Sequence, residues 1–206
     1  LMAAAGGAAA EPVFTLWNPL DEPCTSVCYL PDTRGMATPL PGVELQDVQR
    51  PDGSRVTAVF GLTLPPLGTA VVPLTPAERT TAPSPFRLEG DTLTTPHLRV
   101  RFDARGFITS LVTLADGMEW CDGPFNELIF GEDVPAGWDG WDIDADCLMK
   151  LHSDARLLER SVVADGPLEF RIRCKYEVCD HSILVQDVVF HRESPLVEWD
   201  CRLDWN

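Results

Sequence analysis

One segment of the sequence combines acidic and aromatic side chains in a pattern that could bind a ligand. Neither Lys nor Arg occurs between Gly106 and Met149, whereas acidic residues are frequent there: Asp116, Glu119, Asp122, Glu127, Glu132, Asp133, Asp139, Asp142, Asp144 and Asp146. Trp138 and Trp141 lie within the densest part of this run, 132–144. An indole ring can stack on the apolar C–H face of a pyranose, while carboxylates accept hydrogen bonds from its hydroxyls. The pattern therefore favours a neutral sugar as the ligand.

The same segment is also compatible with a calcium loop or with a solvated loop that binds nothing. Four of its residues alternate as the oxygen ligands of a calcium loop do, namely Asp139, Asp142, Asp144 and Asp146. The run nevertheless lacks both the Gly of the sharp turn and the closing Glu of such a loop. A solvated acidic loop with two Trp residues packed beneath it is the structural alternative. The residue types alone leave the sugar, the calcium ion and the solvated loop all open.

The rest of the sequence carries no catalytic motif. Two carboxylates on one loop could serve as acid and base in glycoside hydrolysis, but spacing along a chain does not give their separation in space. The four His residues are far apart, and no H-E-x-x-H, G-x-S-x-G or phosphate-binding loop occurs. We therefore expect no catalytic residue, metal ligand or cofactor in this chain.

Composition excludes several classes of partner. The 206 residues include 16 basic and 32 acidic side chains, and the resulting net charge of −16 repels phosphate backbones and anionic membranes. No apolar run approaches the roughly 20 residues that a bilayer crossing requires. The seven Cys residues are scattered along the chain, which favours a reducing, cytoplasmic location with buried or idle thiols. We expect neither a nucleic acid nor a membrane as a partner.

Alternation of apolar and polar residues predicts β-strands that must position the acidic segment. In 168–178 the apolar residues Leu168, Phe170, Ile172, Cys174, Tyr176 and Val178 alternate with Glu169, Arg171, Arg173, Lys175 and Glu177. One face should be core and the other solvent-exposed. Segment 197–205 alternates in the same way, with Val197, Trp199, Cys201, Leu203 and Trp205 on the core face. Segment 183–190 is apolar on both faces, which predicts a central strand.

Further strands are expected at 13–17, 24–30, 43–49, 55–63, 69–74, 98–102 and 107–114, with Gly53 and Gly106 in tight turns. Many short strands indicate an all-β sandwich or barrel. Because Leu1 precedes Met2, we interpret 1–10 as a linker or the remnant of an artificial junction. We predict a small β-sandwich at 11–78, a proline-rich linker at 79–85 and a larger β-structure from 86 to 206.

Several motifs, in order, resemble the C-terminal β-region of family-38 glycoside hydrolases, the α-mannosidases. The most specific is Asn126 followed by 130–135 and 138–143, which is similar to the signature N-x-x-x-x-x-E-D-x-P-x-x-W-D-A-W-D-I, with Gly140 in place of Ala. Segments 14–20, 64–68 and 95–111 resemble the family's V-x-N-P-L, V-P-P-L-G and N-x-x-x-V-x-F-D-x-x-G-x-I-x-S-L stretches. The strand at 197–205 is similar as well, so the resemblance covers roughly 12–206.

This resemblance implies a galactose-mutarotase-like supersandwich, of which 86–206 would be the N-terminal part. It also implies a retaining, zinc-dependent α-mannosidase whose zinc, nucleophile and general acid belong to a preceding catalytic domain, so that this chain alone is inactive. Its own N-terminal catalytic domain and an α-mannoside or mannan-type glycan would be the partners. Trp141, Asp142 and Asp139 would line the sugar subsite. Glu132, Asp133 and Trp138 would support the loop.

Two functions from different classes remain as alternatives. The chain could be a stand-alone carbohydrate-binding module, which would bind mannose without a catalytic domain. It could instead be a purely structural or oligomerisation domain, in which case a homo-oligomer is expected.

Overall fold

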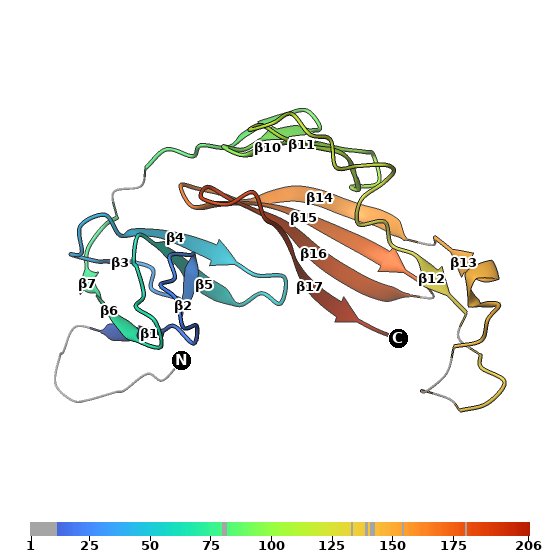
Figure 1. Ribbon diagram of the computed structural model, residues 1–206, viewed down its shortest axis with the longest axis horizontal. Helices are drawn as coiled ribbons and strands as arrows, with labels where there is room; N and C mark the ends of the chain where they lie inside the picture. The colour runs from blue at the N-terminus through green and yellow to red at the C-terminus, as the bar shows by residue number, and fades with distance from the viewer. Residues whose placement is uncertain are drawn as a thin grey trace.

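A computed structural model of the chain describes residues 12–79, 82–132, 134–138, 140, 143–153, 155–179 and 181–206. The regular elements among these residues are β-strands, apart from one short 3₁₀ helix, η1 (Cys147–Met149). The all-β prediction is therefore confirmed, and Figure 1 shows how the sheets are arranged. In this part of the chain, no helix is long and apolar enough to cross a bilayer.

The first seven strands form the N-terminal lobe, which we define as residues 12–79. They are β1 (Val13–Trp17), β2 (Cys28–Pro31), β3 (Met36–Ala37), β4 (Glu44–Gln49), β5 (Arg55–Phe60), β6 (Thr69–Pro73) and β7 (Thr75–Pro76). Their pairing gives three small sheets, ordered β1-β6, β2-β5-β4 and β3-β7. Leu16, Leu30, Val59 and Val72 belong to a buried cluster that joins these sheets.

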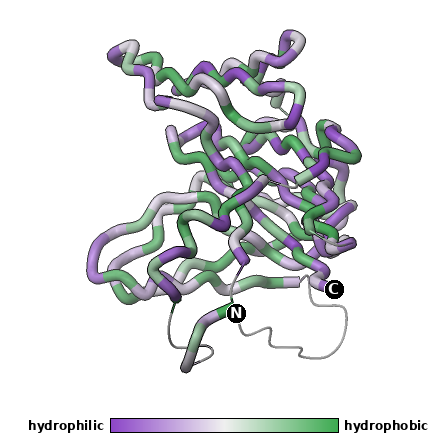
Figure 2. Tube along the Cα trace, turned by 90° about the vertical axis from the view of Figure 1, so that its right-hand side faces the viewer, coloured by the Kyte–Doolittle hydropathy of each residue, from purple (hydrophilic) through white to green (hydrophobic). Residues whose placement is uncertain are grey.

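The remaining strands form the large lobe, which we define as residues 82–206. One antiparallel sheet, ordered β11-β10-β9-β8, contains β8 (Arg87–Glu89), β9 (Thr92–Thr94), β10 (Leu98–Phe102) and β11 (Ile108–Thr113). A second, ordered β14-β15-β16-β17, contains β14 (Arg156–Asp165), β15 (Glu169–Val178), β16 (Ser182–His191) and β17 (Val197–Asp204). The two sheets lie one above the other in Figure 1. Figure 2, in which the chain is coloured by hydropathy, shows apolar residues interspersed with polar ones along their strands.

Aromatic rings fill the space between these two sheets. Phe102 of β10 and Phe190 of β16 meet edge to face with ring centroids 6.3 Å apart, and Phe107 stacks on Tyr176 at 6.0 Å. Burying each such ring stabilises the fold by roughly 1.5–3 kcal/mol. Gly106 has a φ of +85°, and a Cβ there would lie 2.7 Å from the Tyr176 hydroxyl. The predicted turn glycine is thus required both for its φ and for the close approach of β15.

Alternation predicts most of the second sheet correctly. The expected core residues of β15 are buried, from Phe170 to Val178. β16 pairs along its length with β15 and with β17, as expected for a central strand. For β17 the predicted core face is only half right, because Leu203 and Trp205 are 51% and 62% exposed. The core of the large lobe reaches only the first half of β17, where Val197 and Trp199 pack.

The sequence pattern does not predict β14, although this strand is ten residues long. Its register against β15 shifts between Leu157 and Glu159 and again between Val162 and Ala164. Each such bulge inserts one extra residue and reverses the faces of the residues that follow. The sequence of β14 therefore shows no sustained period of two.

The prediction of a solvent-exposed face on β15 is wrong at Glu169 and Arg171. Their side chains are 0% and 2% exposed. The physical reason is that the N-terminal lobe covers this face. Gln46 of β4 donates its amide N–H to the Glu169 carbonyl at 2.8 Å, and its Oε1 accepts from the N–H groups of Leu168 and Glu169.

The strands separate at the proline-rich segment, with β1–β7 before it and β8–β17 after it. The contacts of Gln46 nevertheless join the two lobes closely. The domain limits 11–78 and 86–206, and the role of 79–85 as a linker, stay predictions.

Candidate functional site

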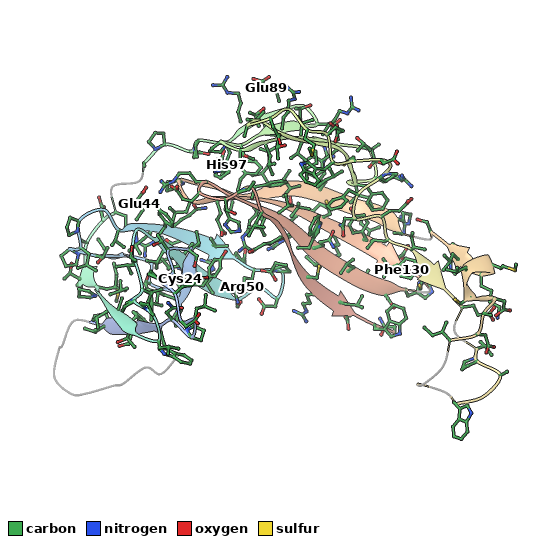
Figure 3. All side chains as sticks on the ribbon, viewed as in Figure 1. Cys24, Glu44, Arg50, Glu89, His97 and Phe130 are labelled. Atoms are coloured by element: carbon green, nitrogen blue, oxygen red, sulfur yellow. The ribbon has the colours of Figure 1, made fainter. Side chains whose placement is uncertain are left out.

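The described residues of the acidic and aromatic segment, 132, 134–138, 140 and 143–150, form an arm that leaves the large lobe. We use the name arm for the segment 132–150. β12 (Phe130–Gly131) and β13 (Leu151–His152) close its base as an antiparallel pair. The rings of Phe130 and His152 lie opposite each other with centroids 6.3 Å apart. In Figure 1 the arm projects from the end of the second sheet that is remote from the N-terminal lobe, and Figure 3 labels Phe130 at its base.

A second contact fixes the chain just before the arm. Asn126 adopts a left-handed backbone, with a φ of 61°, and its amide donates to Gln186 Oε1 of β16 at 2.6 Å. The preceding residue, Phe125, packs on Trp199 of β17 with ring centroids 5.6 Å apart. An Asn accommodates the left-handed conformation better than most residues do. Contacts with β16 and β17 therefore fix the position of the chain shortly before the arm begins.

The described residues of the arm expose an unusual amount of apolar surface. The exposed fractions are 64% for Val134, 81% for Trp138, 69% for Ile143, 75% for Leu148 and 89% for Met149. Contiguous exposed apolar groups beside polar ones are typical of interaction sites. The arm thus combines apolar and acidic groups that are open to a ligand or to a neighbouring domain.

Two of the arm's carboxylates have partners within the arm. Asp144 Oδ2 accepts a hydrogen bond from the N–H of Ala136 at 3.0 Å, and Asp146 Oδ2 lies 3.1 Å from Lys150 Nζ. The hydrogen bond to Asp146 raises the pKa of Lys150 above its ordinary value. These two carboxylates therefore hold the arm's own conformation.

The structure describes only some of the site residues that the sequence predicts. Glu132 directly follows β12 and is exposed, and Trp138 is exposed with a φ of 60°. The other four predicted residues lie outside the described residues, namely Asp133, Asp139, Trp141 and Asp142. The subsite role of the last three and the supporting role of Glu132, Asp133 and Trp138 stay predictions.

Metal binding has no support among the described residues. No group of three or more His, Cys, Asp or Glu side chains in this part of the chain is arranged to hold an ion. Two of the four candidate calcium ligands, Asp139 and Asp142, lie outside it. The calcium hypothesis for the arm is thus not tested.

A second polar cluster, which the sequence pattern does not reveal, lies buried between the lobes. The Tyr29 hydroxyl donates to Glu169 Oε2 at 2.6 Å, and Arg171 Nε donates to Glu169 Oε1 at 2.5 Å. Arg171 also reaches Asp200 Oδ2 at 3.0 Å and lies 3.5 Å from Asp187, whose side chain is 0% exposed. Buried charges are tolerated only when they are paired and hydrogen-bonded in this way.

The protonation states in this cluster follow from its burial. Desolvation and the neighbouring Glu169 raise the pKa of Tyr29 well above its usual range, so its hydroxyl remains a donor. Arg50 lies over the Tyr29 ring at 5.1 Å from its centroid. The only sequence signal for the cluster is the alternation of Glu169, Arg171 and Arg173, which a solvent-facing strand shows equally well. We assign it a structural role, because the side-chain groups of Tyr29, Glu169 and Arg171 pair with one another inside the protein.

Residues 93–206 match the model of the glycosyl hydrolases family 38 C-terminal domain. Because this match covers more than half of the chain, the chain belongs to family 38. The resemblance inferred from the motifs is confirmed.

The relatives are α-mannosidases. Human alpha-mannosidase 2C1 is 28% identical over 178 residues, which are 80% of this chain and 16% of the relative. The mouse alpha-mannosidase 2C1 is 31% identical over 117 residues, which are 53% of this chain and 11% of the relative. The chain therefore spans only a small part of the curated relatives that it matches.

Solved structures show the same fold at low identity. An α-mannosidase from Enterococcus faecalis V583 superposes with a TM-score of 0.58 and 10% identity, covering 93% of this chain and 30% of that one. A glycosyl hydrolase family 38 protein from Enterococcus faecalis gives a TM-score of 0.55 with 10% identity, covering 94% and 32%. Both lobes of the chain thus have counterparts in family-38 structures.

Proposed function

We propose that this chain is a non-catalytic segment of an α-mannosidase that removes terminal α-mannosides from a glycan. The family match and the α-mannosidase relatives support this assignment. The retaining reaction would be carried out by a preceding catalytic domain that holds zinc, the nucleophile and the general acid. The seven scattered Cys residues favour a cytoplasmic location for the whole enzyme.

The arm would place part of the glycan subsite. The observation that carries this proposal is the exposure of apolar side chains, 81% for Trp138 and 69% for Ile143, within a lysine-poor acidic segment. Trp141 would stack on a sugar ring, and Asp142 and Asp139 would accept hydrogen bonds from its hydroxyls. Glu132, Asp133 and Trp138 would support the arm itself, through packing and hydrogen bonds to backbone N–H groups.

The test uses the full-length enzyme with an aryl α-mannoside. Trp141→Ala and Asp142→Asn should each lower kcat/KM by about 10- to 100-fold, since losing one such contact costs roughly 1–3 kcal/mol. Trp17→Ala is the matched control, because Trp17 is also exposed but belongs to β1 of the N-terminal lobe. Wild-type kinetics in both arm variants, with unchanged thermal unfolding, would remove the subsite assignment.

A stand-alone carbohydrate-binding module is the second candidate. The exposed arm carries both an aromatic ring that can stack on a sugar and carboxylates that can accept hydrogen bonds from its hydroxyls. This candidate predicts heat of binding when the 206-residue chain is titrated with mannose or mannobiose, and loss of that heat in Trp141→Ala. A titration without heat at millimolar sugar would exclude it. Homo-oligomerisation, the purely structural alternative, is tested by the molar mass of the same sample in solution.

A further inference from the structure

A cleft with a volume of about 300 Å³ lies between the two lobes, far from the arm. One wall is lined by Thr25, Ser26, Val27, Tyr29 and Phe60, and the other by the turn that joins β16 to β17. The arm lies at the opposite end of the long strands in Figure 1, and ten residues of β-strand span about 33 Å. Any ligand of this cleft therefore binds independently of the arm.

The cleft presents hydroxyls beside a carboxylate. Ser26, Ser194 and Thr25 supply the hydroxyl groups, and Glu198 supplies a carboxylate whose side chain is 55% exposed. Ser26 Oγ shares a hydrogen bond with Cys24 Sγ at 3.3 Å. A hydroxyl can take part in up to three hydrogen bonds, so Ser26 keeps capacity for a ligand.

His191 provides an independent indication of a missing partner. The residue is only 7% exposed, and neither ring nitrogen has a hydrogen-bond partner among the described residues. Its Nε2 lies 3.2 Å from Glu198 Oε2, within ion-pair distance but not aligned for a hydrogen bond. Buried polar groups almost always have partners, whereas the Nδ1 of His191 has none among the described residues and its Nε2 has only the Glu198 carboxylate nearby.

The charges around the cleft select against ions. Arg192 lies over the Phe60 ring at 5.4 Å, and Arg50 lies over the Tyr29 ring at 5.1 Å. Arg192 is also paired with Glu44 at 2.7 Å and with Glu193 at 2.5 Å, so these guanidinium groups act against a cation mainly by occupying the ring faces that it would need. Because Arg192 compensates Glu193, Glu198 is the carboxylate of the cleft that disfavours an anion. A neutral ligand that forms hydrogen bonds is disfavoured neither by the occupied ring faces nor by the Glu198 carboxylate.

We infer that this cleft binds a neutral sugar ring of pyranose size. Glu198 accepts hydrogen bonds from the sugar's hydroxyls, and Ser26 and Ser194 donate to or accept from its remaining oxygens. The volume is at the lower limit of ligand pockets, which fits one ring and not an oligosaccharide.

The test is amide chemical-shift mapping of the 206-residue chain during titration with methyl α-D-mannopyranoside. We expect saturable shifts at Ser26, Ser194 and Glu198 with a Kd on the order of 1 mM. Glu198→Gln should raise that Kd at least about tenfold, since a charged acceptor is lost. Glu89→Gln, an exposed Glu on β8, and Trp141→Ala in the arm should leave it unchanged.

Three results would overturn the inference. They are the absence of saturable shifts at these amides, an unchanged Kd in Glu198→Gln, and shifts produced by n-butylammonium or inorganic phosphate but not by the glycoside. The backbone spectrum of Glu198→Gln reports directly whether that variant is folded. Ser194→Ala, a smaller change on the same wall, provides a second measurement and should also weaken binding.

Discussion

The hydroxyl of Tyr29 donates a 2.6 Å hydrogen bond to Glu169, although 140 positions separate the two residues in the chain. Tyr29 belongs to β2 of the N-terminal lobe and Glu169 is the first residue of β15 in the large lobe. A buried carboxylate at the start of a core strand thus depends on a donor from the other lobe. The two lobes are held in one relative position by polar contacts in addition to apolar ones.

Removing that hydroxyl should weaken the junction. Tyr29→Phe leaves Glu169 with one donor fewer in a buried site, and the expected loss in the free energy of unfolding is about 1–3 kcal/mol. Urea denaturation followed by tryptophan fluorescence measures it. Thr25→Val removes the exposed hydroxyl that contacts Thr63 and serves as the control, with a change below about 0.5 kcal/mol. Equal effects of the two variants would contradict the proposed role of Tyr29.

Arg171 should matter far more than a surface arginine. Arg171→Met leaves the buried Glu169 and Asp187 without their shared cation, and breaking such a pair costs roughly 3–5 kcal/mol. Arg34→Met breaks the exposed pair with Asp32 and should leave the free energy of unfolding nearly unchanged, because solvent screens this pair. The free energy of unfolding of both variants gives the comparison. A similar small loss in each would mean that the buried network is energetically neutral.

Gln46 and Gly166 should behave as a coupled pair. A Cβ at Gly166 would lie 2.3 Å from Gln46 Cδ, so Gly166→Ala must displace the side chain that binds the backbone of Leu168 and Glu169. We expect each single variant, Gln46→Ala and Gly166→Ala, to lose about 1–3 kcal/mol. The double variant should lose clearly less than the sum, because the clash is gone once Gln46 is shortened. Additive losses in this cycle would show that the two positions act separately.

Glu119 should contribute to stability only above acidic pH. The hydroxyl of Ser110 and the N–H groups of Cys121 and Leu111 lower its pKa from 4.5 to about 2. A folded-state pKa below the unfolded value gives stability that is present above pH 4.5 and lost as the pH falls through about 2.

The measurement is the denaturation midpoint of wild type and Glu119→Gln at several pH values across this window. Wild type should lose more of its stability toward low pH than the variant does. Glu89→Gln, an exposed position on β8, is the control and should follow wild type. Parallel pH profiles for wild type and Glu119→Gln would refute the assignment.

Metal removal should abolish the activity of the full-length enzyme without changing the stability of this chain. We expect a chelator to abolish α-mannosidase activity of the full-length protein and zinc to restore it, because the metal would lie in the preceding catalytic domain. Thermal unfolding of the 206-residue chain should be unchanged by the same chelator. A lowered midpoint for the chain alone would instead point to an ion in the acidic arm, as the calcium hypothesis holds.

The sequence by itself determined the strands whose alternation is uninterrupted. Period-two alternation predicts β15, and a run that is apolar on both faces predicts β16, both with nearly correct limits. Each apolar residue of β15 on one face enters a continuous core. The sequence pattern does not predict β14, because two bulges interrupt the alternation of its apolar and polar residues. The acidic arm was also evident from composition, because a long segment without Lys or Arg is visible in a linear sequence.

Only the tertiary structure decided what covers the polar face of β15. Glu169 and Arg171 have the sequence pattern of solvent-facing residues, yet they are buried because β2 and β4 pack over them. The same packing creates the cleft that Glu198, His191 and Ser26 line together. A one-dimensional pattern records which side of a strand a residue occupies, whereas the layer lying against that side depends on contacts between distant parts of the chain.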